Sequence, residues 1–445
     1  MTHNLIQRDL KYIWHPCSQM KDYQEFPPLI IKSARGAYIK LNDNSKIIDA
    51  ISSWWCKNLG HNHPRLKNAL KKQINKFEHV IFANTTNEII VELSEKLANM
   101  TKTLNKLFYA SDGSSAVEAA IKMSFHSRII AGEKNRDRIM ALSNSYHGET
   151  GLALAATNIK LYQQPYRQIL IPSFFLKNIP YVRSKVDPLW QDSAKYWPII
   201  LRQLNTHKDR LTAIIIEPIV QAAGGMLIYA QDFLRRLRDW TKKNHVHLIA
   251  DEIMTGFGRV GLPFAFQHAD IEPDFVCIAK GLTAGWLPMS AVLTTNEIYK
   301  IFYDDFSRGK TFFHSHTHSG NVLAAAVALE TLSILKEENI YTQVNKKEKI
   351  LYDLMLEVSH KTQKLQNIRY IGAIVAADLI LDKNQKNLRL GHRIFQTAAK
   401  FGVLMRPLGN TIYWTPPLNI EESVLLQLKE STIKTIDLVF NSLLN

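Results

Sequence analysis

Four apolar runs in the middle of the chain constrain its fold more than any other feature of the sequence. Each run is dominated by Ile, Val, Leu, Ala and Phe and has the length of a strand that is buried on both faces. The runs cover residues 107–110, 211–216, 247–250 and 275–279, and helical stretches separate them. This alternation predicts an α/β domain that extends from about residue 64 to residue 335.

Polar or ionisable residues follow each of these runs directly. A Ser-Asp-Gly-Ser-Ser turn follows the first run, and Glu217, Asp251 and Lys280 follow the other three. Ligands bind beyond the carboxyl ends of the strands in open α/β sheets. The four ends together therefore predict one crevice, whereas any single one could simply be a surface charge that ends a strand.

The length of the chain leaves room for a second, smaller unit. The chain has 445 residues, enough for two or three domains. The run 290–295 begins only ten residues after Lys280, too soon for a crossover, so we expect it to pair antiparallel with the preceding strand. Beyond residue 335, helices alternate with short strands, and the first helix has one apolar face made of Ile350, Leu351, Leu354, Met355 and Val358.

Composition excludes several classes of protein. Three scattered cysteines are too few for a disulfide framework or a four-cysteine zinc site, which indicates a reducing compartment. The N-terminus is charged where a signal peptide needs an apolar core, and no run reaches the ~18–20 apolar residues of a membrane span. We therefore expect a soluble, cytoplasmic protein with no membrane partner.

The formal net charge of +15 raises the alternative of a nucleic-acid-binding protein. However, the Lys-rich stretches 71–76 and 346–349 lack interleaved aromatic residues and have helical patterns. We interpret them as solvated helix faces and expect no nucleic-acid partner.

Two motifs contain glycines that could approach a ligand. Asp112-Gly113-Ser114-Ser115 precedes a predicted helix over 116–123, and Ser115 with Glu118 fits a capping box. The N-terminus of that helix could bind a phosphate or be a plain helix cap. The segment 256–261 matches G-x-G-x-x-G, but five residues separate it from its strand and no helix follows. We therefore expect a glycine-rich loop there and no dinucleotide site.

Asp251 and Lys280 indicate the chemistry of the crevice. A lysine among small apolar residues can lose its charge and form a Schiff base with a carbonyl compound. A carboxylate that faces a pyridine nitrogen keeps this nitrogen protonated, as in pyridoxal phosphate enzymes. Tyr146 or Trp54 could cover the ring. His314, His316 and His318 lie in a loop containing serine and glycine, and we expect no metal site.

At these residues the sequence resembles the class III, fold-type I pyridoxal phosphate-dependent aminotransferases. LIADEIMTGFGRVG and PDFVCIAKGLTAGWLPMSAVL are similar to the family's cofactor-lysine signature, and the resemblance extends from about residue 10 to residue 420. SSWW, SYHGET and IIEPIVQAAGGM are similar to the branch that converts 8-amino-7-oxononanoate to 7,8-diaminononanoate in biotin biosynthesis, with S-adenosylmethionine as amino donor. The resemblance implies a large domain (64–335) with a mostly parallel seven-stranded sheet. It also implies a smaller α+β domain formed by the segments 1–63 and 336–445.

The resemblance also implies a role for each matching residue. Lys280 would hold pyridoxal phosphate as a Schiff base in a ping-pong reaction, Asp251 would pair with the pyridine nitrogen and Tyr146 would stack on the ring. Gly113 and Ser114 would hold the phosphate, while His316 and Thr317 would reach the phosphate of the partner subunit in a homodimer with shared active sites. Substrate contacts would come from Trp54, Ser315 and Tyr413, and Arg406 would bind the substrate carboxylate. Arg259 and Glu149 would help to shape the donor site, and Glu217 would support it.

Three departures from the family pattern leave the amino donor open. Cys17 replaces an aromatic residue, Ser145 and Glu149 replace Gly and Asp, and His-Thr-His stands in the 313–319 loop. That loop is similar to a subgroup that uses lysine as donor, whereas the indole of Trp54 suits a sulfonium donor. A different ω-amino acid or ornithine-type specificity is the remaining alternative.

Overall fold

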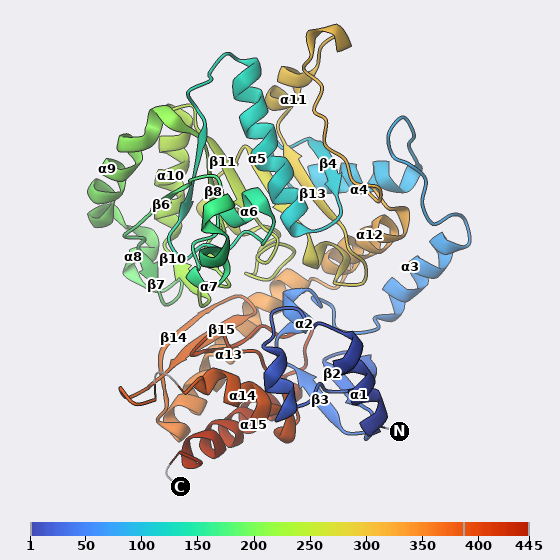
Figure 1. Ribbon diagram of the computed structural model, residues 1–445, viewed down its shortest axis with the longest axis vertical. Helices are drawn as coiled ribbons and strands as arrows, with labels where there is room; N and C mark the ends of the chain where they lie inside the picture. Colours follow the sequence, from blue (N-terminus) through green and yellow to red (C-terminus); the bar gives the residue numbers. More distant parts are fainter. Residues whose placement is uncertain (1, 386–387, 444–445) are drawn as a thin grey trace.

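A seven-stranded sheet forms the centre of the larger of two domains (Figure 1). The computed structural model describes residues 2–385 and 388–443. The strand order is β4-β13-β12-β11-β8-β5-β6. The bounds are β4 (Lys106–Ala110), β5 (Arg138–Leu142), β6 (Phe174–Leu176), β8 (Leu211–Ile216), β11 (His247–Asp251), β12 (Phe275–Ile278) and β13 (Ser290–Thr294).

The sheet is mostly parallel, as predicted. β12, β11, β8, β5 and β6 pair in parallel, whereas β13 pairs antiparallel with both β12 and β4. The short connection after Lys280 therefore has the geometry that its length predicts. The four strands that carry the polar ends lie within this one sheet.

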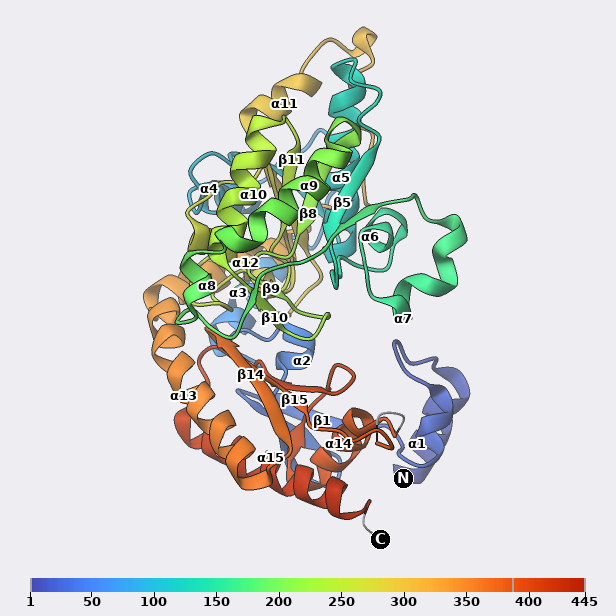
Figure 2. The same ribbon diagram turned by 90° about the vertical axis from the view of Figure 1, so that its left-hand side faces the viewer.

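Helices bury both faces of the sheet (Figure 2). On β8, Ala213 and Ile215 pack with the core under α5, whereas Ile214 and Ile216 pack in the core on the opposite face, near α10 and α12. All six β8 residues are buried, which explains the continuous apolar run. The helices of this domain are α3 (Pro64–Ile74), α4 (Glu88–Ala98), α5 (Gly113–Ile130), α6 (Gly151–Ala155), α7 (Lys160–Gln163), α8 (Pro188–Gln191), α9 (Trp197–His207), α10 (Gln231–Lys243), α11 (Asn296–Phe302) and α12 (Val322–Glu337). A small sheet of β7 (Tyr181–Val182), β10 (Leu227–Tyr229) and β9 (Val220–Gln221) adjoins them.

The two ends of the chain combine in the smaller domain. β16 (Val403–Leu404) pairs in parallel with β3 (Lys46–Asp49), so the sheet β1-β2-β3-β16 contains both N- and C-terminal strands. The predicted apolar face of the first C-terminal helix packs in the core of this domain, with Leu351, Leu354, Met355 and Val358 buried and Ile350 partly buried. The remaining elements are α1 (Thr2–Tyr12), β1 (Ile31–Arg35), β2 (Tyr38–Leu41), α2 (Ser52–Trp55), α13 (Ile340–Thr362), β14 (Leu365–Ile371), β15 (Ile374–Leu379), α14 (Leu390–Ala398), β17 (Thr411–Trp414) and α15 (Glu422–Asn441).

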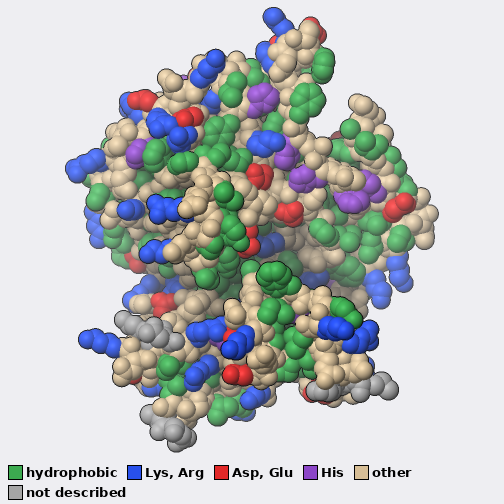
Figure 3. All heavy atoms as spheres, in the orientation of Figure 1, with side chains coloured by type: hydrophobic (Ala, Val, Ile, Leu, Met, Phe, Trp, Pro, Cys, Tyr) green, Lys and Arg blue, Asp and Glu red, His purple; other side chains and the backbone are tan. Residues whose placement is uncertain are grey.

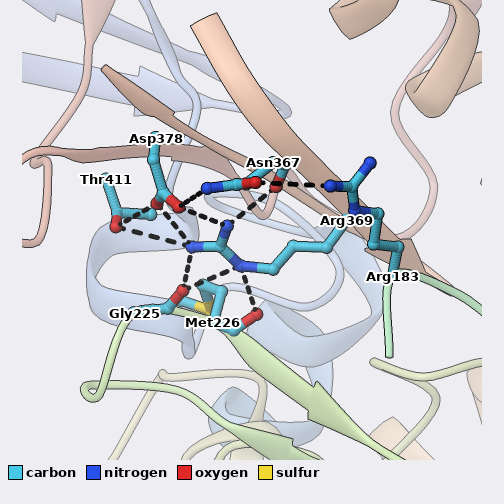
Figure 4. Close-up of polar contacts among 7 residues, drawn as sticks. All are labelled: Arg183, Gly225, Met226, Asn367, Arg369, Asp378 and Thr411. Carbon is cyan, nitrogen blue, oxygen red and sulfur yellow. Dashed lines mark hydrogen bonds and ion pairs between the residues drawn. The ribbon is translucent and has the colours of Figure 1, made fainter. Parts of the chain in front are cut away.

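One buried arginine joins the two domains (Figure 4). Arg369 of β14 donates from Nε to the carbonyls of Gly225 and Met226 in the large domain, at 3.1 and 3.0 Å. Its Nη1 and Nη2 atoms donate to the two carboxylate oxygens of Asp378 on β15, at 3.1 and 2.9 Å. The loop between β9 and β10 is therefore tied to the small-domain sheet.

Charge is spread over the surface. Lys and Arg side chains occur on both domains in the face shown in Figure 3, and Lys71, Lys72 and Lys76 near the end of α3 are exposed. Within the described part of the chain, no helix is long and apolar enough to cross a membrane.

Candidate active site

The polar strand ends converge on one cavity of about 470 Å³. Ser111 after β4, Glu217 after β8, Asp251 at the end of β11 and Lys280 after β12 all line it. Gly113, Ser114 and Tyr146 contribute to the same walls. The first cavity thus brings together the residues predicted to hold the cofactor, except His316 and Thr317. Trp54, the alternative cover for the ring, lines a second cavity instead.

Lys280 lies where β12 ends and a short turn, η6 (Lys280–Thr283), begins. Its φ of 38° is in the left-handed region, so the chain changes direction sharply at this residue. Nζ lies 5.1 Å from the centre of the Trp55 ring. Burial lowers the pKa of the Lys280 ammonium below its ordinary value, although the charges of Asp251, Cys56 and Glu217 oppose this effect. A lower pKa favours the neutral amine, which is the nucleophilic form.

Asp251 has a partner that the sequence analysis did not assign. His147 Nδ1 lies 2.8 Å from Asp251 Oδ2, and the backbone N–H of Ile253 donates to Oδ1 at 3.2 Å. Both side chains are buried. The imidazole therefore orients the carboxylate. The signal that could have identified His147 is its place beside Tyr146 in SYHGET, although the 104 residues to Asp251 hide the pairing.

Glu217 connects the walls of the cavity. Its two carboxylate oxygens accept hydrogen bonds from the backbone N–H groups of Tyr146 and Ala222, at 3.0 and 2.9 Å. Burial raises the pKa of Glu217 to about 7, although His147 and these N–H groups oppose the effect. Glu217 therefore holds the backbone behind Tyr146.

The N-terminus of α5 forms one end of the cavity. Asp112 caps this helix by accepting from the backbone N–H of Ser115 at 3.0 Å and from Ser115 Oγ at 2.8 Å. The predicted capping box of Ser115 and Glu118 is therefore wrong. The helix begins at Gly113, and Glu118 instead accepts hydrogen bonds from the residues at the start of α6. The dipole of α5 and the free N–H groups at its N-terminus suit the binding of a phosphate.

A second cavity of about 770 Å³ shares Trp55, Cys56, Tyr146 and Lys280 with the first. It lies between the domains, and Trp54, Arg406 and Tyr413 line it together with Cys17. The Arg406 guanidinium lies 4.8 Å from the centre of the Trp54 ring, and Nη2 donates to the Cys17 carbonyl at 2.8 Å. The Tyr413 hydroxyl accepts a hydrogen bond from Trp55 Nε1 at 3.1 Å.

Cys17 and Glu149, which belong to two of the three departures from the family pattern, lie next to each other beside this cavity. The Tyr146 hydroxyl donates to Glu149 Oε1 at 2.8 Å, and Cys17 Sγ lies 3.9 Å from the same oxygen. Burial raises the pKa of Tyr146, and the Glu149 carboxylate raises it further. Ser145 lies elsewhere, since its buried hydroxyl donates to the Ala156 carbonyl at 2.7 Å.

The loop that carries the third departure lies outside the cavity walls. Ser315, His316 and Thr317 are not among the described residues that line the two cavities. His316 Nδ1 lies 3.1 Å from Ser111 Oγ, so the loop approaches the first cavity from outside. Histidine side chains gather on this face of the molecule (Figure 3).

Arg259 lies behind the site. It is fully buried, and its guanidinium donates to the Pro416 carbonyl at 2.7 Å and to Asn58 Oδ1 at 3.1 Å. It is not among the described residues that line the cavities, so its expected contribution to the donor site is at most indirect.

These residues fit pyridoxal phosphate. The first cavity combines an amine, a buried carboxylate and the N-terminus of an 18-residue helix. The backbone packs closely around the start of that helix, because a Cβ at Gly148 would lie 2.2 Å from Ser114 Oγ and one at Gly113 would lie 3.0 Å from the Ile253 side chain. His147 Nε2 is buried with no hydrogen-bond partner among the described residues, which leaves a polar atom for a bound group. The fold and the site define a pyridoxal phosphate-dependent enzyme.

Comparisons with known proteins identify the family. The model of aminotransferase class III matches residues 19–436, and the chain belongs to this family. The adenosylmethionine-8-amino-7-oxononanoate aminotransferase of Helicobacter pylori is 38% identical over 98% of both chains. The crystal structure of the enzyme of that name from Methanocaldococcus jannaschii has a TM-score of 0.90, with 30% identity over 98% of this chain and 99% of the other. An omega transaminase from Pseudomonas jessenii, solved in complex with PMP, has a TM-score of 0.88, with 25% identity over 98% of both chains.

Proposed function

We propose that this pyridoxal phosphate-dependent aminotransferase converts 8-amino-7-oxononanoate to 7,8-diaminononanoate in biotin biosynthesis, with S-adenosylmethionine as the amino donor. The observation that carries the proposal is the second cavity, because Lys280 and Arg406 line the same space. The rings of Trp54, Trp55 and Tyr413 form part of its walls. The acceptor has a carboxylate and a ketone joined by an apolar chain, which matches this arrangement. The names of the full-length relatives support the same substrate.

Each residue of the first cavity would have a separate role toward the cofactor. When bound, pyridoxal phosphate withdraws electrons from the carbon that loses or gains the amino group. Lys280 would hold the cofactor aldehyde and carry the transferred proton on Nζ. Asp251, oriented by His147, would face the pyridine nitrogen, and Tyr146 would cover the ring. Gly113 and Ser114 would bind the phosphate at the start of α5.

Arg406 would bind the acceptor carboxylate. Its guanidinium is held against the Trp54 ring and by the Cys17 carbonyl, so it is already oriented before a substrate binds. A planar guanidinium can donate two parallel hydrogen bonds to a carboxylate. Tyr413 and Trp55 form the wall beside it.

The Glu149 carboxylate supports a cationic donor. It accepts a hydrogen bond from Tyr146 and lies 3.9 Å from Cys17 Sγ, and both of these residues line the second cavity. From there the carboxylate can attract the sulfonium of S-adenosylmethionine or the ammonium of lysine. The Trp54 ring, which we expected to face the sulfonium, already has Arg406 as a partner. Lysine therefore remains the alternative donor, followed by other ω-amino acids and ornithine.

Half-reactions with single amines test the donor. S-adenosylmethionine, lysine and ornithine are added separately to the purified holoenzyme, and the visible absorbance of the bound cofactor is followed. We expect S-adenosylmethionine alone to bleach it, and mass spectrometry to detect 7,8-diaminononanoate once the acceptor is added. The Lys280→Ala variant should lack the visible absorbance band of cofactor bound to the lysine. Bleaching by lysine or ornithine instead would refute the proposed donor, and absence of the product with every donor would refute the acceptor.

We also propose a homodimer in which the 315–317 loop contributes to the partner's site. Large apolar side chains are exposed around this loop, with Val80, Ile81 and Phe313 at 53%, 65% and 77% exposure. Mixing Lys280→Ala with a His316→Ala/Thr317→Ala double variant tests the arrangement. Mixed dimers have one intact site, so we expect activity that neither variant shows alone. Mixed dimers without activity would contradict the shared site.

A further inference from the structure

The turn α2 has a backbone conformation that L-amino acids rarely adopt. Ser52, Ser53, Trp54 and Trp55 have φ values of 49°, 45°, 71° and 70°. Left-handed φ brings Cβ close to the following carbonyl oxygen, so residues other than glycine adopt it singly and seldom in a run. Such a conformation persists only where surrounding contacts hold it, and it concentrates at functional sites.

The carboxylate of Asp49 supplies several of these contacts, and Ser52 Oγ adds one by donating to the Thr415 carbonyl at 2.7 Å. Oδ1 accepts hydrogen bonds from the backbone N–H groups of Ser53 at 2.9 Å and Ile51 at 3.3 Å. Oδ2 accepts one from Ser53 Oγ at 2.7 Å and lies 2.8 Å from His61 Nε2. Asp49 is fully buried at the end of β3, so water cannot replace these donors.

The turn places two consecutive indoles against two functional cations. Trp54 contacts the Arg406 guanidinium, and Trp55 lies beneath Lys280 Nζ with its own Nε1 fixed by Tyr413. Asp49 and His61 are not among the described residues that line the two cavities. Asp49 and His61 can therefore affect substrate binding only indirectly, through the conformation of the turn.

We propose that Asp49, oriented by His61, is a positioning residue that holds the left-handed turn and thereby sets Trp54 and Arg406 for the substrate carboxylate. The proposal rests on the proposed function for the identity of the substrate. Asp49→Asn replaces a carboxylate oxygen with an NH2 group that faces other hydrogen-bond donors. The turn should then lose part of the contacts that hold its left-handed conformation. Asp43→Asn is the matched control, because Asp43 accepts two hydrogen bonds from Ser45 in an exposed turn of the same domain.

A double-mutant cycle with Trp54→Phe separates positioning from a general structural effect. We expect Asp49→Asn to raise KM for the acceptor about tenfold, which corresponds to the loss of one hydrogen bond to a charged group, with a smaller change in kcat. In the Trp54→Phe background the same substitution should change KM no more than about twofold. Equal effects in the two backgrounds would overturn the proposal, as would an equal effect of Asp43→Asn.

Near-UV circular dichroism of the cofactor-free chain gives a second readout. The spectrum of wild type minus that of Trp54→Phe isolates the signal of Trp54 among the eight tryptophans. This difference should collapse in the Asp49→Asn background and persist in the Asp43→Asn background. If Asp49→Asn does not fold, His61→Gln, which removes one contact of the carboxylate, replaces it in the cycle.

The outcomes distinguish this proposal from the proposed function. An unchanged Trp54 difference spectrum in the folded variant overturns the positioning role, even where the wild type makes 7,8-diaminononanoate. A wild type that makes no diaminononanoate refutes the proposed function. In that case, a collapsed difference spectrum still supports the role of Asp49 in holding the turn.

Discussion

Replacing Arg369 with methionine should loosen the contact between the domains. Methionine fills a similar volume but leaves the Gly225 and Met226 carbonyls without their donor and Asp378 without its cation (Figure 4). Breaking a fully buried ion pair costs about 3–5 kcal/mol. The Asp378 side chain is 30% exposed and keeps a 2.8 Å hydrogen bond from Thr411, so we expect a loss of about 3 kcal/mol, at the lower end of that range.

This loss converts to a shift in melting temperature. An unfolding entropy of about 2.1 cal/mol/K per residue amounts to about 0.9 kcal/mol/K for this chain, so the melting temperature should fall by about 3 °C. Differential scanning calorimetry of the holoenzyme measures the shift. Because the tethered loop includes Ala222, which donates to Glu217 in the cofactor cavity, cofactor affinity should fall as well.

Arg183→Met provides the control in the same network. Arg183 is exposed and makes one long hydrogen bond of 3.4 Å to Asn367, so its removal should cost less than about 0.5 kcal/mol. A melting temperature of Arg369→Met equal to that of the wild type, or an equal shift for Arg183→Met, would refute the reasoning.

Three further predictions concern the site itself. Arg406→Met should raise KM for the acceptor about 10–100-fold with little change in kcat, measured by steady-state kinetics; an equal rise for a ketone without a carboxylate would contradict its role. His147→Leu should weaken cofactor binding about tenfold in an absorbance titration, because Asp251 loses its partner; unchanged affinity would show that the pair is not needed. The raised pKa of Glu217 favours the folded state while the carboxyl is protonated, so this contribution, about 3 kcal/mol, is lost as the pH rises from 4.5 to about 7. Glu217→Gln should flatten that decline in pH-dependent denaturation curves, and an unchanged slope would contradict it.

The strand ends were predictable from local sequence. A run such as 211–216 has apolar residues at every position because both faces of β8 are buried, and this property is visible without the structure. The length between Lys280 and β13 determines an antiparallel pairing in the same way. The convergence of Glu217, Asp251 and Lys280 follows from the direction of parallel strands.

The predictions that failed or were missing depend on contacts between distant segments. The pattern of Ser115 and Glu118 is compatible with a capping box, but Asp112 competes for the same N–H group and α6 provides donors for Glu118. His147 is a single histidine in the sequence until the fold brings it to Asp251.

The sequence by itself determined the class of sheet, the order of its polar ends and, through resemblance, the cofactor lysine. These features depend on periodicity, connection length and residue type, all of which are local. The tertiary structure decided which side chain orients Asp251, where Arg259 lies, and that Ser52–Trp55 turns left-handed without a glycine. A conformation disfavoured by local sterics exists only because Asp49 and its neighbours hold it, and such contacts are defined once the chain has folded.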